Sequence, residues 1–256
     1  MYILPAVPLW DPVFDGAATV FPFVFAFEVR CAYDLSIPPM STSTSATDLK
    51  AIVKEGYDAI APKYHSWAAP RLTQKRTEYI ERLGKSLPKG SKVLELGCGA
   101  GLPATQQLVD QGFEVLGVDI SSSQLTLAKE HVPRAQFMEG DMTAIEFEKG
   151  SFDAVMAFYS LFHLPRDEHG PMLKKMVDWL KPGGWLLFNL HTDEKDHMRD
   201  DWMGVKMFST GLGIEGNRQM LVEYGAGLID VEDVIDKEFV GRFEEDFHWI
   251  CAKKSF

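Results

Sequence analysis

The sequence has few cysteines and few positive charges for its length. Three of its 256 residues are cysteine, Cys31, Cys98 and Cys251, and they lie far apart with no Cys-x-x-Cys pair. This pattern predicts neither a disulfide framework nor a zinc site, and it is typical of a reducing compartment such as the cytoplasm. Lysine and arginine number 26 against 37 acidic residues, a formal net charge of −11. We therefore expect no nucleic acid as the main partner, because phosphates are bound by basic surfaces.

The sequence also lacks an apolar run long enough to cross a membrane. The apolar stretch at residues 17–27 is interrupted by a proline and falls short of the roughly 20 residues that a bilayer requires. Asp11 and Asp15 precede it, which argues against a signal peptide. We expect residues 1–39 to be a leader of uncertain role. Three interpretations stay open. The leader could pack on the main domain as an appendage, bind a partner or a membrane surface, or be translated sequence upstream of a working start at Met40.

One stretch organises the rest of the chain. Residues 93–101 read Val-Leu-Glu-Leu-Gly-Cys-Gly-Ala-Gly, and helical spacing follows from Leu102 onward. The pattern predicts a strand, a glycine loop and a helix. Glycines let the backbone turn sharply and approach a ligand closely, and the N-terminus of the next helix favours anionic groups. The Gly-x-Gly-x-x-Gly spacing of dinucleotide-binding loops is absent, since residue 102 is leucine.

This acid-x-Gly-x-Gly-x-Gly loop resembles motif I of the class I S-adenosylmethionine-dependent methyltransferases. Asp119 ends the second predicted strand, where the family holds the ribose hydroxyls of the cofactor, and residues 140–142 read Gly-Asp-Met, where the family meets adenine. Residues 152–165 resemble the fourth strand and its loop, and residues 180–186 match the turn into the fifth strand. The resemblance covers residues 55–195 in motif detail and continues in layout to the C-terminus.

The resemblance implies S-adenosylmethionine as cofactor and a Rossmann-like α/β fold. In the family a seven-stranded, mostly parallel sheet has the order 3-2-1-4-5-7-6, with the seventh strand antiparallel and helices on both faces. A single domain would span residues 40–256, with N-terminal lid helices at 48–90, a cofactor-binding core at 91–190, and a substrate lid with C-terminal strands at 191–256. The residues that the resemblance assigns to the cofactor are Tyr64, Glu95, Gly97, Cys98, Gly99, Gly101, Asp119, Ile120, Asp141, Met142 and Phe158.

Asp119 has a competing interpretation as a helix cap. Ser121 and Gln124 have the spacing of a capping box, however, and such a box would leave the Asp119 carboxylate free for a ligand. NAD-dependent enzymes also use an acid at this place, so Asp119 alone does not separate the two cofactors. Asp141 favours S-adenosylmethionine, because no NAD fingerprint calls for an acid there.

The region after the fifth predicted strand has two interpretations. Residues 191–214 mix aromatic, methionine and polar side chains, which suits a substrate lid or a surface loop pinned by a few buried side chains. A helix at residues 216–224 and two strands at 228–239 and 243–253 follow, joined by a short turn that predicts an antiparallel pair. We expect an apolar or aromatic acceptor, on the evidence of four aromatic residues near the predicted lid: Tyr64, Trp67, Trp202 and Phe208.

Several reaction types are disfavoured by missing motifs. There is no Asn/Asp-Pro-Pro-Tyr for amino-methylation of DNA bases or protein glutamine, and no Pro-Cys for cytosine C5 chemistry. Phe158 stands where metal-dependent catechol-type enzymes carry an acid, so no metal is expected. A hydroxyl acceptor benefits from a general base, and the candidates are His163 and His191, each just beyond a predicted strand. A lone histidine in a loop is more often a hydrogen-bonded packing residue, and this interpretation stays open for both.

The sequence thus predicts S-adenosylmethionine-dependent methyl transfer to a small molecule, by in-line displacement driven mainly by proximity and orientation. Three alternatives remain open: a protein-substrate methyltransferase, a cofactor-binding scaffold or regulator without turnover, and an NAD-dependent oxidoreductase, which the glycine spacing disfavours. The atom that is methylated and the oligomeric state are left open.

Overall fold

The computed structural model describes residues 45–71, 73–240 and 243–256. The expectations for residues 1–39 and for a start at Met40 lie outside these ranges, as do residues 241–242 of the predicted C-terminal turn. The described strands are β1 (Lys92–Leu96), β2 (Glu114–Asp119), β3 (Gln136–Glu139), β4 (Phe152–Ala157), β5 (Leu180–His191), β6 (Asp196–Trp202), β7 (Val205–Thr210), β8 (Leu228–Val240) and β9 (Phe243–Lys254). The described helices are α1 (Ala46–Ala68), α2 (Gln74–Ser86), α3 (Ala104–Asp110), α4 (Ser122–His131), α5 (His169–Trp179) and α6 (Gly213–Tyr224), with 3₁₀ turns η1 (Leu161–His163) and η2 (Arg166–Glu168).

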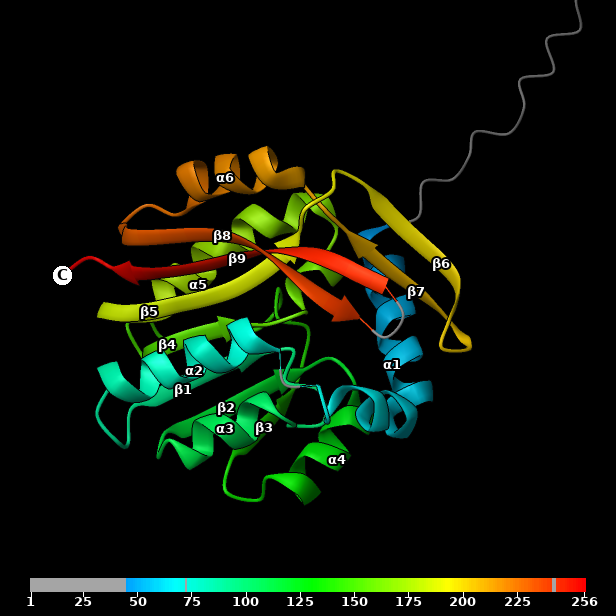
Figure 1. The fold of residues 1–256 in the computed structure, drawn as a ribbon, viewed down its shortest axis with the longest axis horizontal. Helices are drawn as coiled ribbons and strands as arrows, with labels where there is room; N and C mark the ends of the chain where they lie inside the picture. Colours follow the sequence, from blue (N-terminus) through cyan, green and yellow to red (C-terminus); the bar gives the residue numbers. More distant parts are fainter. Residues whose placement is uncertain (1–44, 72, 241–242) are drawn as a thin grey trace, which may run out of the picture. The chain divides into compact units, whose positions relative to one another are not determined.

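Seven of these strands form one twisted sheet in the order β3-β2-β1-β4-β5-β9-β8 (Figure 1). Strands β1 to β5 run parallel to one another, and β9 runs antiparallel to both β5 and β8. Since β8 and β9 are the sixth and seventh strands of this sheet along the chain, the predicted order and the predicted antiparallel seventh strand are confirmed. The order reverses between β1 and β4, where ligands bind in open α/β sheets.

The central strands carry apolar side chains on both faces because helices cover both faces. On one face Leu94 and Leu96 of β1 pack in a cluster with Met172 and Met176 of α5. On the other face Val93 packs in a cluster with residues of α2 and α3. This arrangement buries β1 almost completely and holds its carboxyl end, where the glycine loop begins, in a fixed position.

A second sheet, which the sequence did not predict, contains only β6 and β7. The two strands form an antiparallel hairpin that lies beside α1 (Figure 1). Met207 and Phe208 of β7 are buried against Val53 of α1, which explains how a hairpin with so polar a β6 is held in place. Most of the segment between β5 and α6 is therefore a regular β-hairpin and not a surface loop.

One detail of the predicted layout is corrected. The turn into the fifth strand was expected at residues 180–186, but α5 ends at Trp179 and β5 already begins at Leu180, so these residues lie inside the strand. The pairing of β4 with β5 shifts register across this segment, and Gly183 has φ +77°. The glycines therefore make a bulge rather than a turn.

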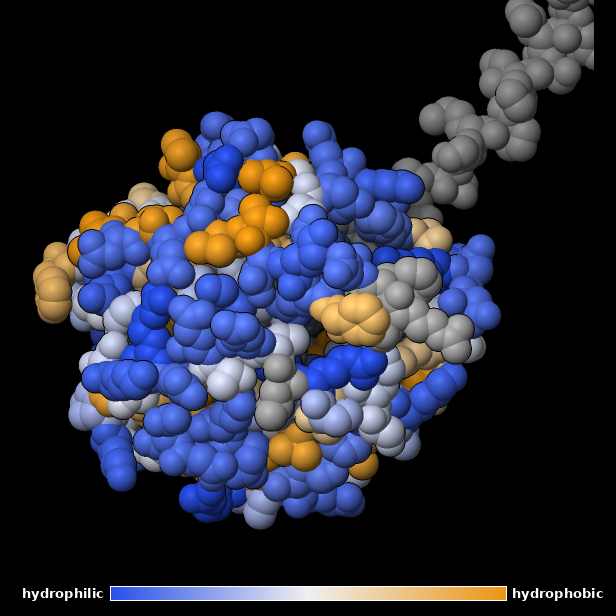
Figure 2. All heavy atoms as spheres, in the orientation of Figure 1, coloured by the Kyte–Doolittle hydropathy of each residue, from blue (hydrophilic) through white to orange (hydrophobic). Residues whose placement is uncertain are grey.

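The surface is mostly hydrophilic in the view of Figure 2, apart from apolar side chains gathered over α6 and β8. Val222 of α6 and Ile229, Val231 and Ile235 of β8 are among the exposed apolar residues. None of the helices that the structure describes is long and apolar enough to cross a membrane.

Candidate functional site

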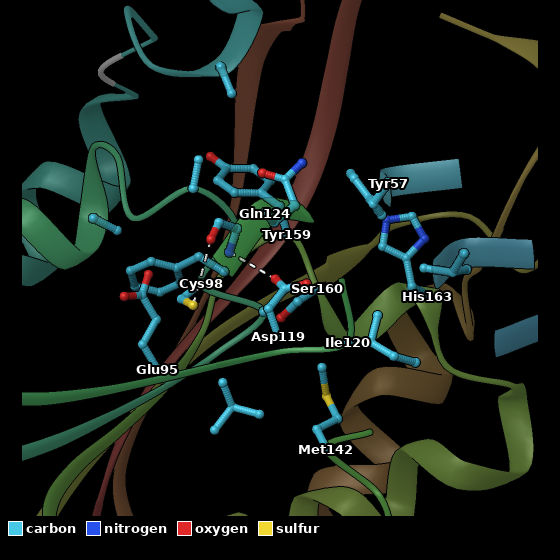
Figure 3. A pocket seen from close by; sticks show the side chains of 18 of the residues that line it. Tyr57, Glu95, Cys98, Asp119, Ile120, Gln124, Met142, Tyr159, Ser160 and His163 are labelled. Atoms are coloured by element: carbon cyan, nitrogen blue, oxygen red, sulfur yellow. Dashed lines mark hydrogen bonds between the residues drawn. The ribbon is translucent and has the colours of Figure 1, made fainter. Parts of the chain in front are cut away.

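Two adjoining cavities open at the carboxyl ends of the central strands. The first is lined by the glycine loop after β1, by Asp119 and Ile120 after β2, by Asp141 and Met142 after β3, and by Phe158 after β4. The second lies between α1, η1, the β6–β7 hairpin and the facing ends of β8 and β9. Six residues line both cavities: Tyr57, Tyr64, Ala68, Arg76, Tyr159 and His163. Figure 3 shows Tyr57 and His163 together on one side of the first cavity and Glu95 on the other.

The glycine loop needs its glycines for two different reasons. Gly97 and Gly99 have φ +72° and +53°, the left-handed region that side chains other than glycine rarely adopt. A Cβ on Gly97 would lie 2.2 Å from Ser160 Cβ, whereas a Cβ on Gly99 would meet only Gln124 Oε1, at 3.9 Å. Gly97 therefore permits close packing of the loop against the segment between β4 and η1, while Gly99 leaves open space on the cavity side.

The Asp119 carboxylate joins the glycine loop to α4. One oxygen accepts a hydrogen bond from the Gly99 N–H at 2.8 Å, and the other accepts one from the Ser121 N–H at 2.9 Å. The expectation that Asp119 is free is thus corrected, since it also caps backbone groups. Each oxygen keeps a second lone pair for a ligand. Burial raises the pKa of Asp119 to about 6, against which the backbone hydrogen bonds act.

Only half of the predicted capping box forms. The Ser121 hydroxyl accepts from the Gln124 N–H, but the Gln124 amide does not return to Ser121. Instead both polar atoms of the Gln124 side chain are buried without a hydrogen-bond partner, in a residue that lines the first cavity. A buried unpaired amide is costly, so this side chain is suited to a polar ligand in that cavity.

Glu95 is buried at the base of the first cavity. Its exposed fraction is 4%, and one oxygen accepts a hydrogen bond from the Thr105 hydroxyl at 2.6 Å. Burial raises the pKa of Glu95 to about 7, so this carboxyl titrates near neutral pH. Cys98 is also buried here, and burial raises the pKa of its thiol well above the usual value, which keeps the thiol protonated.

Asp141 is held by α1. Lys50 Nζ lies 2.7 Å from one Asp141 oxygen and 3.0 Å from Glu168, and the other Asp141 oxygen accepts from Thr143. Burial opposes both charges, but these contacts outweigh it, so the pKa of Lys50 is raised and the pKa of Asp141 is lowered. Asp141 is therefore held as an anion, and its ion pair with Lys50 connects α1 to the segment after β3.

His163 is clamped between α1 and β7. Its Nδ1 lies 2.6 Å from the Phe208 carbonyl oxygen, and its Nε2 lies 2.9 Å from the Tyr57 hydroxyl. A carbonyl can only accept, so Nδ1 carries the proton and Nε2 accepts from Tyr57. Burial lowers the pKa of His163 to about 4. The imidazole is thus neutral near pH 7, and its lone pair is already engaged by Tyr57.

Tyr159 separates the two cavities in a strained conformation. Its φ is +55°, and its N–H donates to Asn189 Oδ1 at 2.7 Å. Its hydroxyl donates to Glu238 Oε2 at 2.6 Å. Glu238 also accepts from Trp249 Nε1 at 3.0 Å, so both of its oxygens are engaged. These long-range contacts hold the ring at the junction of the cavities.

His191 lies deeper in the second cavity, beside a carboxylate. It is 6% exposed, its Nδ1 lies 3.3 Å from Glu245 Oε1, and its ring lies 4.2 Å from that of Phe162. Burial lowers the pKa of His191 to about 4 and raises that of Glu245. No described residue is hydrogen-bonded to His191 Nε2, in contrast to the engaged Nε2 of His163.

Comparisons with known proteins agree with this geometry. Residues 93–184 match the family described as "Methyltransferase domain". This segment contains the glycine loop and nearly all of β1 to β4, which build most of the wall of the first cavity. Over these residues the chain is similar to methyltransferases.

Curated relatives that match this part of the chain carry the names of methyltransferases. The chain is 31% identical over 144 residues to a putative methyltransferase YqeM of Bacillus subtilis, covering 54% of this chain and 57% of that protein. It is 36% identical over 127 residues to a 2-methyl-6-phytyl-1,4-hydroquinone methyltransferase of Synechocystis, covering 46% of this chain and 39% of that protein. The chain thus spans about half the length, or less, of these curated relatives.

A solved structure supports the Rossmann-like fold described above. The DhpI–SAH complex superposes with a TM-score of 0.63 at 19% identity, covering 82% of this chain and 99% of that one. At this identity the likeness shows the fold alone.

Ten of the eleven residues that were predicted to contact the cofactor line the first cavity. The exception is Gly101, which has φ +78° and lies behind the loop, where a Cβ would come within 3.1 Å of Val132. Tyr64, Trp67 and Trp202 line the second cavity, as expected, but Phe208 is buried and contributes its carbonyl to His163.

Among the cavity residues that the sequence reasoning missed are Arg76, Gln124, Glu238 and Glu245. Gln124 was assigned to a cap. The two glutamates lie on β8 and β9, where charged residues normally face solvent, and no spacing distinguishes them. Of these four residues, only Arg76 could have been recognised from the sequence. It shares the buried face of α2 with Tyr79, Ile80 and Leu83, where a charged residue is unusual.

Proposed function

We propose that the chain binds S-adenosylmethionine in the first cavity and transfers its methyl group to a small-molecule acceptor in the second. The wall that the cavities share supports this proposal. Six common lining residues bring the two spaces together beside the glycine loop, so a reactive group in one is presented to the other. The hydroquinone specificity in the name of one relative is consistent with a small acceptor.

The residues of the first cavity fit this cofactor. Gly99 leaves room for close approach, Asp119 has lone pairs for ribose hydroxyls, and the buried Gln124 amide lacks a partner. Asp141 and Met142 line the same cavity, and we assign them to the adenine. When bound, the cofactor supplies a methyl group activated by attachment to a sulfonium. The protein's contribution is mainly to orient the acceptor and exclude water.

On the acceptor side we assign different roles to the two histidines. His163 positions Tyr57, since its only lone pair accepts from the Tyr57 hydroxyl. His191 is the general base for a hydroxyl acceptor, because its Nε2 is not engaged by a described residue and Glu245 lies beside Nδ1. His191 Nε2 would take the acceptor's proton while the methyl group leaves the cofactor's sulfur for the acceptor oxygen, which leaves neutral S-adenosylhomocysteine and a protonated His191. Thiol or amine acceptors need this step less.

The first test is thermal unfolding of the full chain with S-adenosylhomocysteine or NAD. At 100 times its dissociation constant, a ligand stabilises by about 2.7 kcal/mol, which raises the midpoint by roughly 5–10 °C at this size. We expect this rise with S-adenosylhomocysteine and none with NAD. Absence of any rise with S-adenosylhomocysteine would contradict the proposal at its centre.

The second test is turnover, followed as release of S-adenosylhomocysteine with a panel of phenols, amines and thiols. With a hydroxyl acceptor, His191→Gln should lower kcat by roughly 10²–10⁴-fold and change KM little, whereas His163→Gln should have the smaller effect. Cofactor binding without turnover on any acceptor would favour the scaffold alternative.

A further inference from the structure

The arginines of the described chain fall into two groups. Four of the seven form an ion pair with a carboxylate at 2.6–2.9 Å: Arg82, Arg134, Arg166 and Arg218. The other three, Arg71, Arg76 and Arg199, form no ion pair with a described residue. All three line the second cavity. Unpaired arginines in a chain with a net charge of −11 would be expected to find carboxylates, so their convergence on one cavity requires an explanation.

The cavity has an excess of positive charge. Its charged lining consists of these three arginines and two acids, Glu238 and Glu245, with no described lysine or aspartate. Glu238 is engaged by Tyr159 and Trp249, and Glu245 lies beside His191. Neither acid is within ion-pairing distance of an arginine among the described residues, so the guanidinium groups keep their capacity to bind an anion.

Two of these arginines belong to the second cavity alone. The Arg71 guanidinium lies 3.9 Å from the centroid of the Trp67 ring, and one of its N–H groups donates to the Trp67 carbonyl. A cation–π contact of this kind, together with the hydrogen bond, restrains the guanidinium and leaves its other N–H groups available. Arg199 comes from β6 and is exposed. Arg76 is 7% exposed and has a buried Nε–H without a partner, but it lines both cavities.

The remaining walls suit a flat apolar body. Trp67, Trp202, Phe162 and Phe247 are among the rings that line this cavity. Arginine forks bind carboxylates through two parallel hydrogen bonds, and aromatic walls favour rings. We propose that the methyl acceptor is an aromatic carboxylate whose anion is bound by Arg71 and Arg199. This rests on the proposed function, since it takes the second cavity as the acceptor site.

The test compares 2-naphthoate with its uncharged analogue 2-naphthamide, by calorimetry on the full chain saturated with S-adenosylhomocysteine. We expect the carboxylate to bind at least about tenfold more tightly, as charge-assisted hydrogen bonds are about twice as strong as neutral ones. Arg71→Gln/Arg199→Gln should remove this preference and leave naphthamide affinity within about twofold. Arg134→Gln, which breaks a surface ion pair with Asp110, is the matched control and should keep the preference.

Arg199→Glu provides a second variant that does not disturb the interior, because Arg199 is exposed. It should weaken naphthoate binding more than naphthamide binding. Equal affinities in the unaltered protein, a preference that survives the arginine variants, or failure of both probes to bind would each overturn the proposal. The proposed function is judged separately, by whether S-adenosylhomocysteine stabilises the chain before any probe is added.

Discussion

The two cavities are built in different ways. The first is formed at consecutive strand ends, and its characteristic contact, Gly99 N–H to Asp119, joins residues 20 apart. The second depends on contacts such as Tyr57 to His163 and Tyr159 to Glu238, which join residues 106 and 79 apart. The strand-end wall of the first cavity is therefore a property of local backbone geometry, with α1 closing one side, while the second cavity exists only when α1, the β6–β7 hairpin and β8–β9 are assembled. Variants in the two cavities should fail in different ways.

The largest effect is expected from Gly99→Val. A side chain here meets almost no protein atom, so the chain should still fold, although φ +53° strains a valine and should lower the unfolding temperature somewhat. The side chain would fill the space that the cofactor needs, so we expect no detectable S-adenosylhomocysteine binding by calorimetry, with the circular dichroism spectrum of a folded protein. Gly97→Ala is the contrast, since its Cβ would collide with Ser160 and lower the unfolding temperature itself. Normal affinity in Gly99→Val would refute the close-approach argument.

Asp119→Ala should have the next largest effect. It removes the acceptor of two backbone hydrogen bonds as well as the expected ribose contacts. Loss of hydrogen bonds to a charged group predicts about 1.5–3 kcal/mol weaker S-adenosylhomocysteine binding, measured by calorimetry. Asp110→Ala, on the surface, is the control. Unchanged binding in Asp119→Ala would remove this residue from the site.

The cavities should also differ in their response to pH. The pKa of Asp119 is raised to about 6 by burial, and a ligand that binds the carboxylate must displace its proton. Affinity for S-adenosylhomocysteine should therefore fall as pH drops below about 6, approaching tenfold per unit. His163 and His191, with pKa values of about 4, stay neutral over this range. Calorimetry between pH 5 and 8 checks this, and a pH-independent affinity would contradict it.

The smallest effect is expected from Lys50→Gln, in the helix that borders both cavities. Loss of the contacts to Asp141 and Glu168 should lower the free energy of unfolding by about 1 kcal/mol, measured by urea denaturation at low salt. The difference should shrink at high salt. Lys85→Gln is the matched control, because its ion pair is 4.0 Å long and exposed. Equal losses in the two variants would show that Lys50 does not tie down α1.

The core of the fold was predictable because its signals are local. The glycine loop, the acid that ends β2 and the Gly-Asp-Met after β3 are each recorded within a few consecutive residues. The β6–β7 hairpin was not predictable in the same way. Its first strand, Asp-His-Met-Arg-Asp-Asp-Trp, shows no clean alternation, and its stability comes from Met207 and Phe208 packing on α1.

The chemistry of the histidines illustrates the same limit. Sequence position placed both His163 and His191 beyond strand ends but did not distinguish them. The distinction comes from a carbonyl on β7 and a hydroxyl on α1, which engage both nitrogens of His163, and from Glu245 on β9 beside His191. Hydrogen-bond partners of this kind have no fixed spacing along the chain.

Local sequence thus determined the strand–loop–helix unit and the strand-end wall of the first cavity, because backbone turns and strand-end carboxylates follow from short-range patterns, while the strand order followed from the resemblance that these motifs carry. Tertiary structure decided which histidine keeps a free nitrogen, which arginines remain unpaired, and what encloses the second cavity. Those properties depend on groups that approach only after the sheet, α1 and the hairpin have packed, and their burial sets both the charge and the hydrogen bonding of the site.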